Sequence, residues 1–231
     1  MNEIPSLRPV SAAVALPFLL GGLVLAGPAE GKAENAPPSP RPWLEKKVEA
    51  ARDLAVRKVK EGSPEAKKLE QDARALINEM LDWDEMTRRS LGSEWKKRSK
   101  AEQAEFSKLL RDMIEASYES KMRMASRGKA KKPSEVKIIW EDESIRGNKA
   151  KIAARVAAEK SKGMIEFSML FDGKRWKVYD VAIDDVSTVR TYRSQFRKLI
   201  KEKGFGALLD RMRAKAKDIK EGRGDLASAM R

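Results

Sequence analysis

The side chains that could do chemistry in this sequence are the carboxylates of the stretch WKVYDVAIDDVSTVR. Asp184 and Asp185 could form a dyad that shares a proton, but neighbouring side chains in an extended segment point apart. We therefore expect both to be turn residues before a helix. Asp180 lies in an otherwise apolar strand pattern, where a buried carboxylate needs a partner. Arg193 and Arg197 are the expected partners, so a structural salt bridge is favoured over catalysis.

The composition removes the commonest catalytic groups. The 231 residues include no cysteine and no histidine, which excludes thiolate catalysis, Ser-His-Asp triads and zinc sites built from these ligands. The carboxylate-containing stretch also lacks a nucleophile-base pair and a cluster of metal ligands. The sequence therefore predicts a protein that is not an enzyme and that holds no metal and no cofactor.

The net charge bears on the partners. The formal charge is +14 at pH 7, with the largest excess of basic residues between positions 190 and 231. Such a charge favours anionic partners, namely nucleic acid, anionic membrane surfaces or lipid A-type glycolipids. It also suits an ordinary well-solvated surface, because Lys and Arg alternate with Glu and Asp along most of the expected helices.

The N-terminus has the pattern of an export signal. Arg8 precedes an uncharged run that contains VSAAVALPFLLGGLVLAG and ends in small residues, as in secretory signal peptides. We predict a cleaved signal peptide over residues 1–29 and hence an exported protein. A membrane anchor is the alternative, but Pro17, Gly21 and Gly22 weaken a spanning helix. Export argues against a nucleic-acid partner.

Composition divides the remainder into a Pro-rich tether (30–42), a folded domain (43–219) and a flexible tail (220–231). In the first half of the domain, apolar residues recur at helical spacing from Trp43 to the basic loop SRGKAKKP. Ser99 and Glu102 form a capping box that opens a long helix. About four helices are expected here.

Period-2 alternation then predicts four strands, at 136–140, 151–158, 164–171 and 175–183. Short connections, among them the hairpin turn Asp172-Gly173, indicate an antiparallel meander. Ser187 is the expected N-cap of a following helix, and another helix is expected after Gly204. The fold class is α+β, with helices packed on one side of a four-stranded antiparallel meander sheet.

The sheet and the facing helices offer a large apolar layer. Such a layer can close into a solid core or leave a cavity, and its methionines adapt to varied ligands. The layer consists of Phe106, Leu110, Met113, Tyr118, Tyr192 and Phe196 from helices, with Ile165, Phe167, Met169, Phe171, Tyr179 and Val181 from strands.

Two segments, DWDEMTRRSLGSEW and WKVYDVAIDDVSTVRTYRSQF, stand in this order along the chain. They resemble, in collinear order, the signatures of the MlaC, or toluene-tolerance (Ttg2-type), family of periplasmic phospholipid-binding ABC-transport proteins, and the resemblance covers residues 77–212. Matching positions of the second segment are Trp176, Val178, Tyr179, Asp180, Val181, Val186, Ser187, Tyr192, Arg193 and Phe196. The chain departs from the family pattern at Asp185, Thr188 and Thr191, at the turn and the helix start.

The resemblance implies a carrier that takes a phospholipid, as cargo, into an apolar pocket between sheet and helices formed by the twelve residues above. It would shuttle lipid between an outer-membrane lipoprotein complex and an inner-membrane ABC transporter complex, which maintains outer-membrane lipid asymmetry. Arg190, Arg193 and Arg197 are expected at the pocket opening or at a docking surface, while Asp180 and Ser187 have structural roles.

Three other interpretations remain open. The carrier could load a hopanoid or another isoprenoid lipid. The chain could be a basic envelope scaffold with a filled core and no ligand. It could also be an enzyme that uses Asp180 or the Asp184-Asp185 pair.

Overall fold

The structure is a computed structural model that describes residues 37–126, 137–158 and 161–221. The predicted signal peptide, most of the tether and the tail after residue 221 lie outside the described residues. The chain divides into two units, and the unit Ala36–Arg231 contains every described residue. Within the described ranges, no helix has the length and apolar character needed to cross a membrane.

Five α-helices and a short 3₁₀ helix are described: α1 (Arg41–Val56), α2 (Pro64–Met80), α3 (Trp83–Leu91), η1 (Gly92–Lys97), α4 (Lys100–Ser126) and α5 (Thr188–Lys220). The predicted capping box opens α4, where Ser99 N donates to Glu102 Oε2 at 2.7 Å and Glu102 N donates to Ser99 Oγ at 3.2 Å. The predicted break at Gly204 is a kink within α5, because this glycine has a φ of 84°.

The strands form one antiparallel sheet in the order β1 (Lys137–Arg146), β2 (Lys149–Ala158), β3 (Ser161–Phe171), β4 (Trp176–Ile183) and β5 (Val186–Ser187). The meander is confirmed, but it has five strands where four were predicted. Asp184 and Asp185 have φ values of 46° and 65°, as in the tight turns that connect hairpin strands. The chain therefore pairs back on β4 for two residues before α5 begins.

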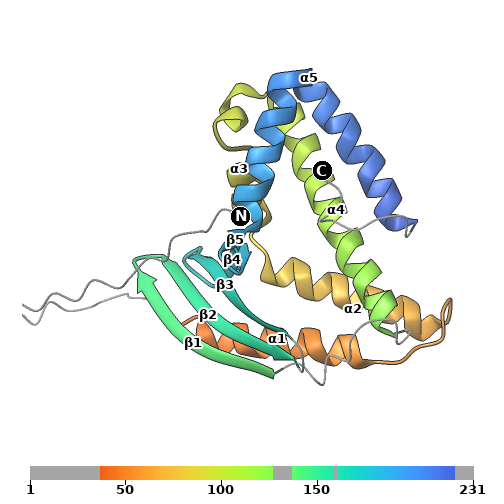
Figure 1. The fold of residues 1–231 in the computed structure, drawn as a ribbon, viewed down its shortest axis with the longest axis vertical. Coiled ribbons are helices and arrows are strands. Elements are labelled where there is room, and N and C mark those ends of the chain that lie inside the picture. Colours follow the sequence, from red (N-terminus) through yellow and green to blue (C-terminus); the bar gives the residue numbers. More distant parts are fainter. Residues whose placement is uncertain (1–36, 127–136, 159–160, 222–231) are drawn as a thin grey trace, which may run out of the picture. The chain divides into compact units, whose positions relative to one another are not determined.

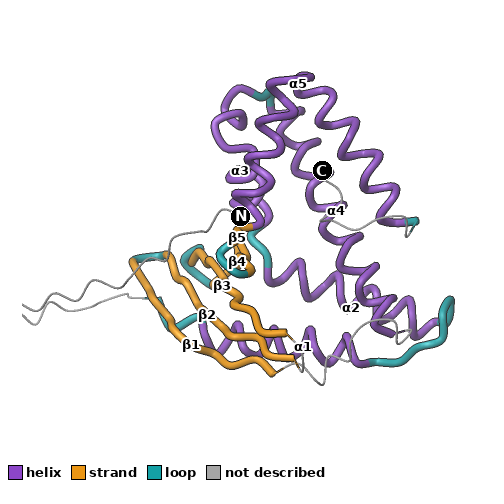
Figure 2. The backbone as a smooth tube through the Cα atoms, in the orientation of Figure 1, coloured by secondary structure: helices purple, strands orange, loops and turns teal. Residues whose placement is uncertain are grey.

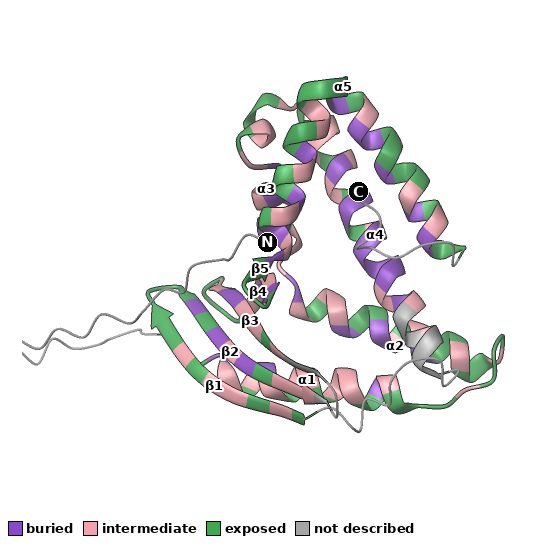
Figure 3. Ribbon diagram, viewed as in Figure 1, coloured by how far each residue is buried: buried purple, intermediate pink, exposed green. Residues whose placement is uncertain are grey.

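The helices cover one face of the sheet, as the burial along β2 shows. Ile152 and Ala154 are buried, whereas Lys151 and Arg155 are exposed. Figures 1 and 2 show the strands gathered in one curved sheet, with α3, α4 and α5 grouped beyond the β4–β5 edge. In Figure 3 the buried positions of α4 and α5 face each other. The predicted α+β fold class is confirmed.

Aromatic rings of α4 and α5 pack against each other in the core. Phe106 is 0% exposed and its ring meets the ring of Phe196 edge-on, at 5.4 Å between centroids. The Tyr192 ring stacks on the Phe196 ring, at 5.5 Å between centroids. Met169 of β3 is also fully buried. This part of the layer between helices and sheet is closely packed.

Candidate functional site: an apolar cavity

A cavity of about 430 Å³ lies between α1, α2, α4 and strands β3 and β4. Its volume falls in the range of about 300–1,000 Å³ that is usual for ligand pockets. The interior of a protein is normally packed with few voids larger than a water molecule. The lining consists of Val48, Ala51, Arg52, Ala55, Ile77, Met80, Leu81, Met86, Ile114, Tyr118, Phe167, Val181 and Thr188. Apart from Arg52, Thr188 and the hydroxyl of Tyr118, the lining side chains are apolar.

The cavity exists because the side chains that α1 directs toward the sheet are short and leave space unfilled. Val48, Ala51 and Ala55 recur at helical spacing and form the wall on α1. Across from them, Phe167 projects from β3, and its ring lies 6.0 Å from that of Trp140. Alanine side chains do not reach far enough to fill the layer at this point.

A bulge in β4 determines which side chains of this strand face the cavity. Ser168 pairs with Asp180 but Met169 pairs with Val178, so Tyr179 is the extra residue of a bulge. The bulge shifts the alternation of side chains by one residue. Val181 therefore lies opposite Phe167 on the inner face, and Tyr179 leaves that face and packs under the Arg89 guanidinium at 4.3 Å.

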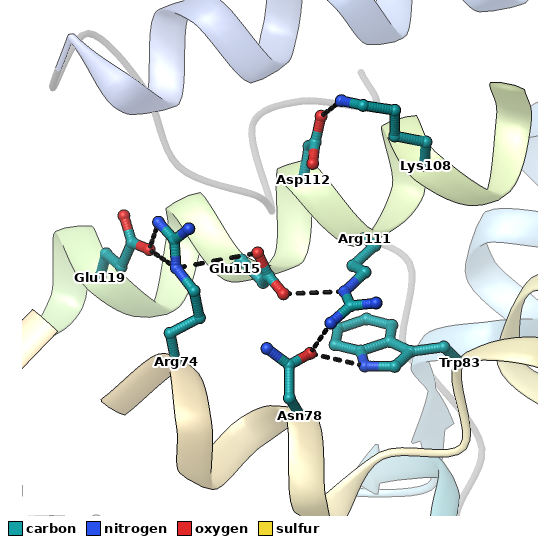
Figure 4. A network of polar contacts seen from close by, with 8 residues as sticks. All are labelled: Arg74, Asn78, Trp83, Lys108, Arg111, Asp112, Glu115 and Glu119. Carbon is teal, nitrogen blue, oxygen red and sulfur yellow. Dashed lines mark hydrogen bonds and ion pairs between the residues drawn. The ribbon is translucent and has the colours of Figure 1, made fainter. Parts of the chain in front are cut away.

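A polar network clamps two walls of the cavity together (Figure 4). Arg74 of α2 donates to Glu119 of α4, with Nε at 2.8 Å from Oε1. Asn78 Oδ1 accepts from Arg111 Nη2 at 2.6 Å and from Trp83 Nε1 at 2.8 Å. The network joins α2, α3 and α4 through polar side chains that do not themselves line the cavity.

Three lining residues carry polar groups. Thr188 Oγ1 donates to the Val181 carbonyl at 2.8 Å. The Tyr118 hydroxyl has no hydrogen-bond partner among the described residues, and burial raises its pKa, so it remains neutral at physiological pH. Arg52 Nη1 lies 3.0 Å from Glu49 Oε2. In the parts of the chain that the structure describes, no group of acidic residues could hold a metal ion.

Three of the twelve residues predicted for the pocket line this cavity: Tyr118, Phe167 and Val181. Six others are at most 4% exposed within the core: Phe106, Leu110, Met113, Met169, Tyr192 and Phe196. Of these, Met113 and Phe196 also line a smaller hollow of about 170 Å³, which lies mainly between the two halves of α5. Phe171 packs on the Trp176 ring at 5.3 Å. Ile165 precedes Phe167 by two residues on the same face of β3 and is not part of the lining.

The predicted salt bridge from Asp180 to Arg193 or Arg197 is wrong. Ser187 Oγ donates to Asp180 Oδ2 at 2.5 Å, and Val189 N donates to Asp180 Oδ1 at 3.0 Å. The first turn of a helix has backbone N–H groups without helical partners, and Asp180 accepts from one of them. Ser187 is the predicted N-cap, since its Oγ accepts from Arg190 N at 3.0 Å.

The carboxylate pair and the three arginines have other contacts. Asp184 Oδ1 accepts from Met164 N at 2.8 Å and so ties the turn to β3. Arg190 Nη2 donates to the Asp185 carbonyl at 3.1 Å, and Arg193 Nε donates to the Arg89 carbonyl at 2.7 Å. Arg190, Arg193 and Arg197 are exposed, and none of them lines the cavity.

The sequence did not identify α1 as the main wall, and it did not identify Arg52. A signal for both was present: Val48, Ala51 and Ala55 mark one stripe of α1, and Arg52 follows Val48 by four residues on the same stripe. An arginine inside an apolar stripe is thus the sequence feature that marks this wall of the cavity.

Comparisons with known proteins agree with this architecture. Residues 49–214 match the family model for the MlaC protein. A solved structure of a phospholipid-binding protein from Ralstonia solanacearum, in complex with a phospholipid, has a similar fold: the TM-score is 0.63 at 15% identity, over 79% of this chain and 99% of that chain. No curated protein matches the sequence significantly. Because the family model covers more than half of its residues, the chain belongs to the MlaC family.

Proposed function

We propose that this protein is a phospholipid carrier whose cavity encloses acyl chains. The observation that carries the proposal is the apolar space of about 430 Å³ between α1 and the sheet. Two comparisons support it, the membership of the MlaC family and the shared fold with a phospholipid-binding protein in complex with a phospholipid. The groups around the cavity suit binding better than catalysis, because its polar side chains are few and Asp180 serves the start of α5.

The energetics favour a carrier that holds its cargo firmly. Each CH₂ group that leaves water for an apolar site contributes about 0.8 kcal/mol. Acyl chains therefore bind without specific hydrogen bonds, and spontaneous release is slow. A carrier of this kind needs a partner that opens the cavity, and α1 is the wall with the smallest side chains.

The cellular role that we propose is transfer of lipid across the periplasm, between an outer-membrane lipoprotein complex and an inner-membrane ABC transporter complex. The predicted signal peptide and the formal charge of +14 support it. A strongly basic protein associates rapidly with acidic docking faces and anionic membranes. The exposed Arg190, Arg193 and Arg197 are candidates for such contacts.

The proposal is tested by purifying the mature protein under native conditions and analysing its lipid extract by mass spectrometry. We expect a stoichiometric phospholipid, together with a native mass that exceeds that of the bare chain by one lipid. A hopanoid in the extract would support a lipid carrier but would identify a different cargo. An empty extract and a bare native mass would favour the ligand-free scaffold and reject the proposal.

A further inference from the structure

We infer that Arg52 binds the head-group phosphate, so that this cavity selects phosphate-bearing lipids over neutral lipids with the same acyl chains. The inference rests on the proposed function and adds a specificity-determining residue to it. It starts from one observation: of the thirteen described lining residues, Arg52 is the only one with a charge.

The position of Arg52 suits a contact with a polar head group. It lies on the cavity wall of α1, next to Ala51 and one turn after Val48. Its side chain is 31% exposed, so it reaches both the apolar space and the solvent. A long arginine side chain can lie along apolar surface while its guanidinium stays at the polar boundary. A lipid with its chains in the cavity places its phosphate at such a boundary.

The chemistry of the guanidinium matches a phosphate. Arginine presents a planar fork of N–H donors that binds two phosphate oxygens at once, and such charge-assisted pairs are stronger than neutral hydrogen bonds. An apolar wall beside the pair lowers the local dielectric and strengthens the attraction further.

The ion pair between Arg52 and Glu49 does not block this role. Glu49 is 61% exposed, and its ion pair with Arg52 lies within one helical turn at the surface. Exposed pairs of this kind contribute little to stability. Glu49 can therefore balance the charge of Arg52 in the empty protein and give way to a phosphate. Tyr118 of α4 lines the same cavity, and its hydroxyl is a second hydrogen-bond donor on the lining residues.

Arg41 provides a matched control on the same helix. Its side chain is 30% exposed and its Nε lies 3.0 Å from Glu45 Oε1. Arg41 thus resembles Arg52 in exposure and in the length of its ion pair, but it does not line the cavity. Replacing either arginine by glutamine removes the same charge from α1.

The test compares two probes with identical chains, dioleoyl phosphatidylglycerol and dioleoylglycerol, on delipidated mature protein by native mass spectrometry. We expect wild type to prefer the phospholipid. Arg52→Gln should lower the affinity for phosphatidylglycerol by about 10- to 100-fold, as expected for a lost charged hydrogen bond, and leave dioleoylglycerol binding unchanged. Arg41→Gln should behave as wild type, and Arg52→Lys, which keeps a charge without the fork, should fall between wild type and Arg52→Gln.

The outcomes separate this inference from the function beneath it. If Arg52→Gln and Arg52→Lys both keep the wild-type ratio of affinities for the two probes, Arg52 does not bind the phosphate. The proposed carrier function is not affected by that result. The same conclusion follows if Arg41→Gln loses as much affinity as Arg52→Gln, because a general charge effect would explain both. If wild type binds neither probe, the carrier function fails, and the inference fails with it.

Discussion

Replacing Ala51 by phenylalanine separates a true cavity from a filled core. Ala51 is half-buried and lines the cavity from α1, so a larger side chain there enters empty apolar space. Ala73 of α2 is the matched control, because it is 0% exposed within a second cluster formed with Leu54, Leu69 and Leu76. The same substitution at Ala73 meets atoms on all sides.

The two variants should change stability in opposite directions. A buried phenylalanine side chain contributes about 1.5–3 kcal/mol, and its lower helix propensity costs up to about 0.7 kcal/mol. Ala51→Phe should therefore stabilise the delipidated protein by about 1–2 kcal/mol. Ala73→Phe should destabilise it by about 1–3 kcal/mol or more, since overpacking forces side chains and backbone to shift.

Urea unfolding of the delipidated proteins measures both values, and lipid extraction reports on binding. Ala51→Phe should also lose phospholipid, because the aromatic ring occupies the space of the acyl chains. The reasoning is refuted if Ala51→Phe is as destabilised as Ala73→Phe, or if it retains a full complement of lipid.

Three further predictions concern stability. Phe106→Ala removes a fully buried ring from the contact between α4 and α5 and should cost about 3–5 kcal/mol in urea unfolding; a loss below about 1 kcal/mol would contradict the packed core at this position. Asp180→Ala should lose about 1–3 kcal/mol, because it leaves the Val189 N–H without its acceptor, while phospholipid still copurifies; lost binding in a folded variant would point to a direct role. The hydrogen bond from the backbone N–H of Ser99 lowers the pKa of Glu102 below its ordinary 4.5. That contribution to the free energy of unfolding is present above pH 4.5 and is lost as the pH falls through the lower folded pKa, so Glu102→Gln should flatten the acid side of the pH profile; an unchanged profile would reject this cause.

Local signals in the sequence predicted much of the fold. The Ser99 and Glu102 capping box, the Ser187 N-cap and the break at Gly204 depend on one or two residues whose side chains or backbone freedom determine a helix end. Period-2 alternation identified four strands. It missed β5 because the two-residue strand is too short to show a period, and it depends on the positive φ of Asp184 and Asp185.

The cavity could be predicted less well, because it depends on where the side chains of two packed elements leave space unfilled. Apolar periodicity marks the face that points inward, and Phe106 and Phe167 look alike by this criterion although one is core and the other lines the cavity. Tyr179 was predicted to line the pocket, but the β4 bulge changes the direction of its side chain. The spacing of apolar residues along β4 does not reveal a bulge. Asp180 was paired with arginines because the pattern shows charge but does not show the free N–H groups at a helix start.

The location of the acyl chains is the central claim, and photocrosslinking tests it most directly. The mature protein would be loaded with a phospholipid that carries a diazirine near the end of one acyl chain, irradiated, digested and sequenced by mass spectrometry. We predict crosslinks to peptides of α1 and of β3–β4 that contain Ala51, Ala55, Phe167 or Val181. Crosslinks confined to the smaller hollow of about 170 Å³ between the two halves of α5, next to Leu199 and Met212, would contradict the account.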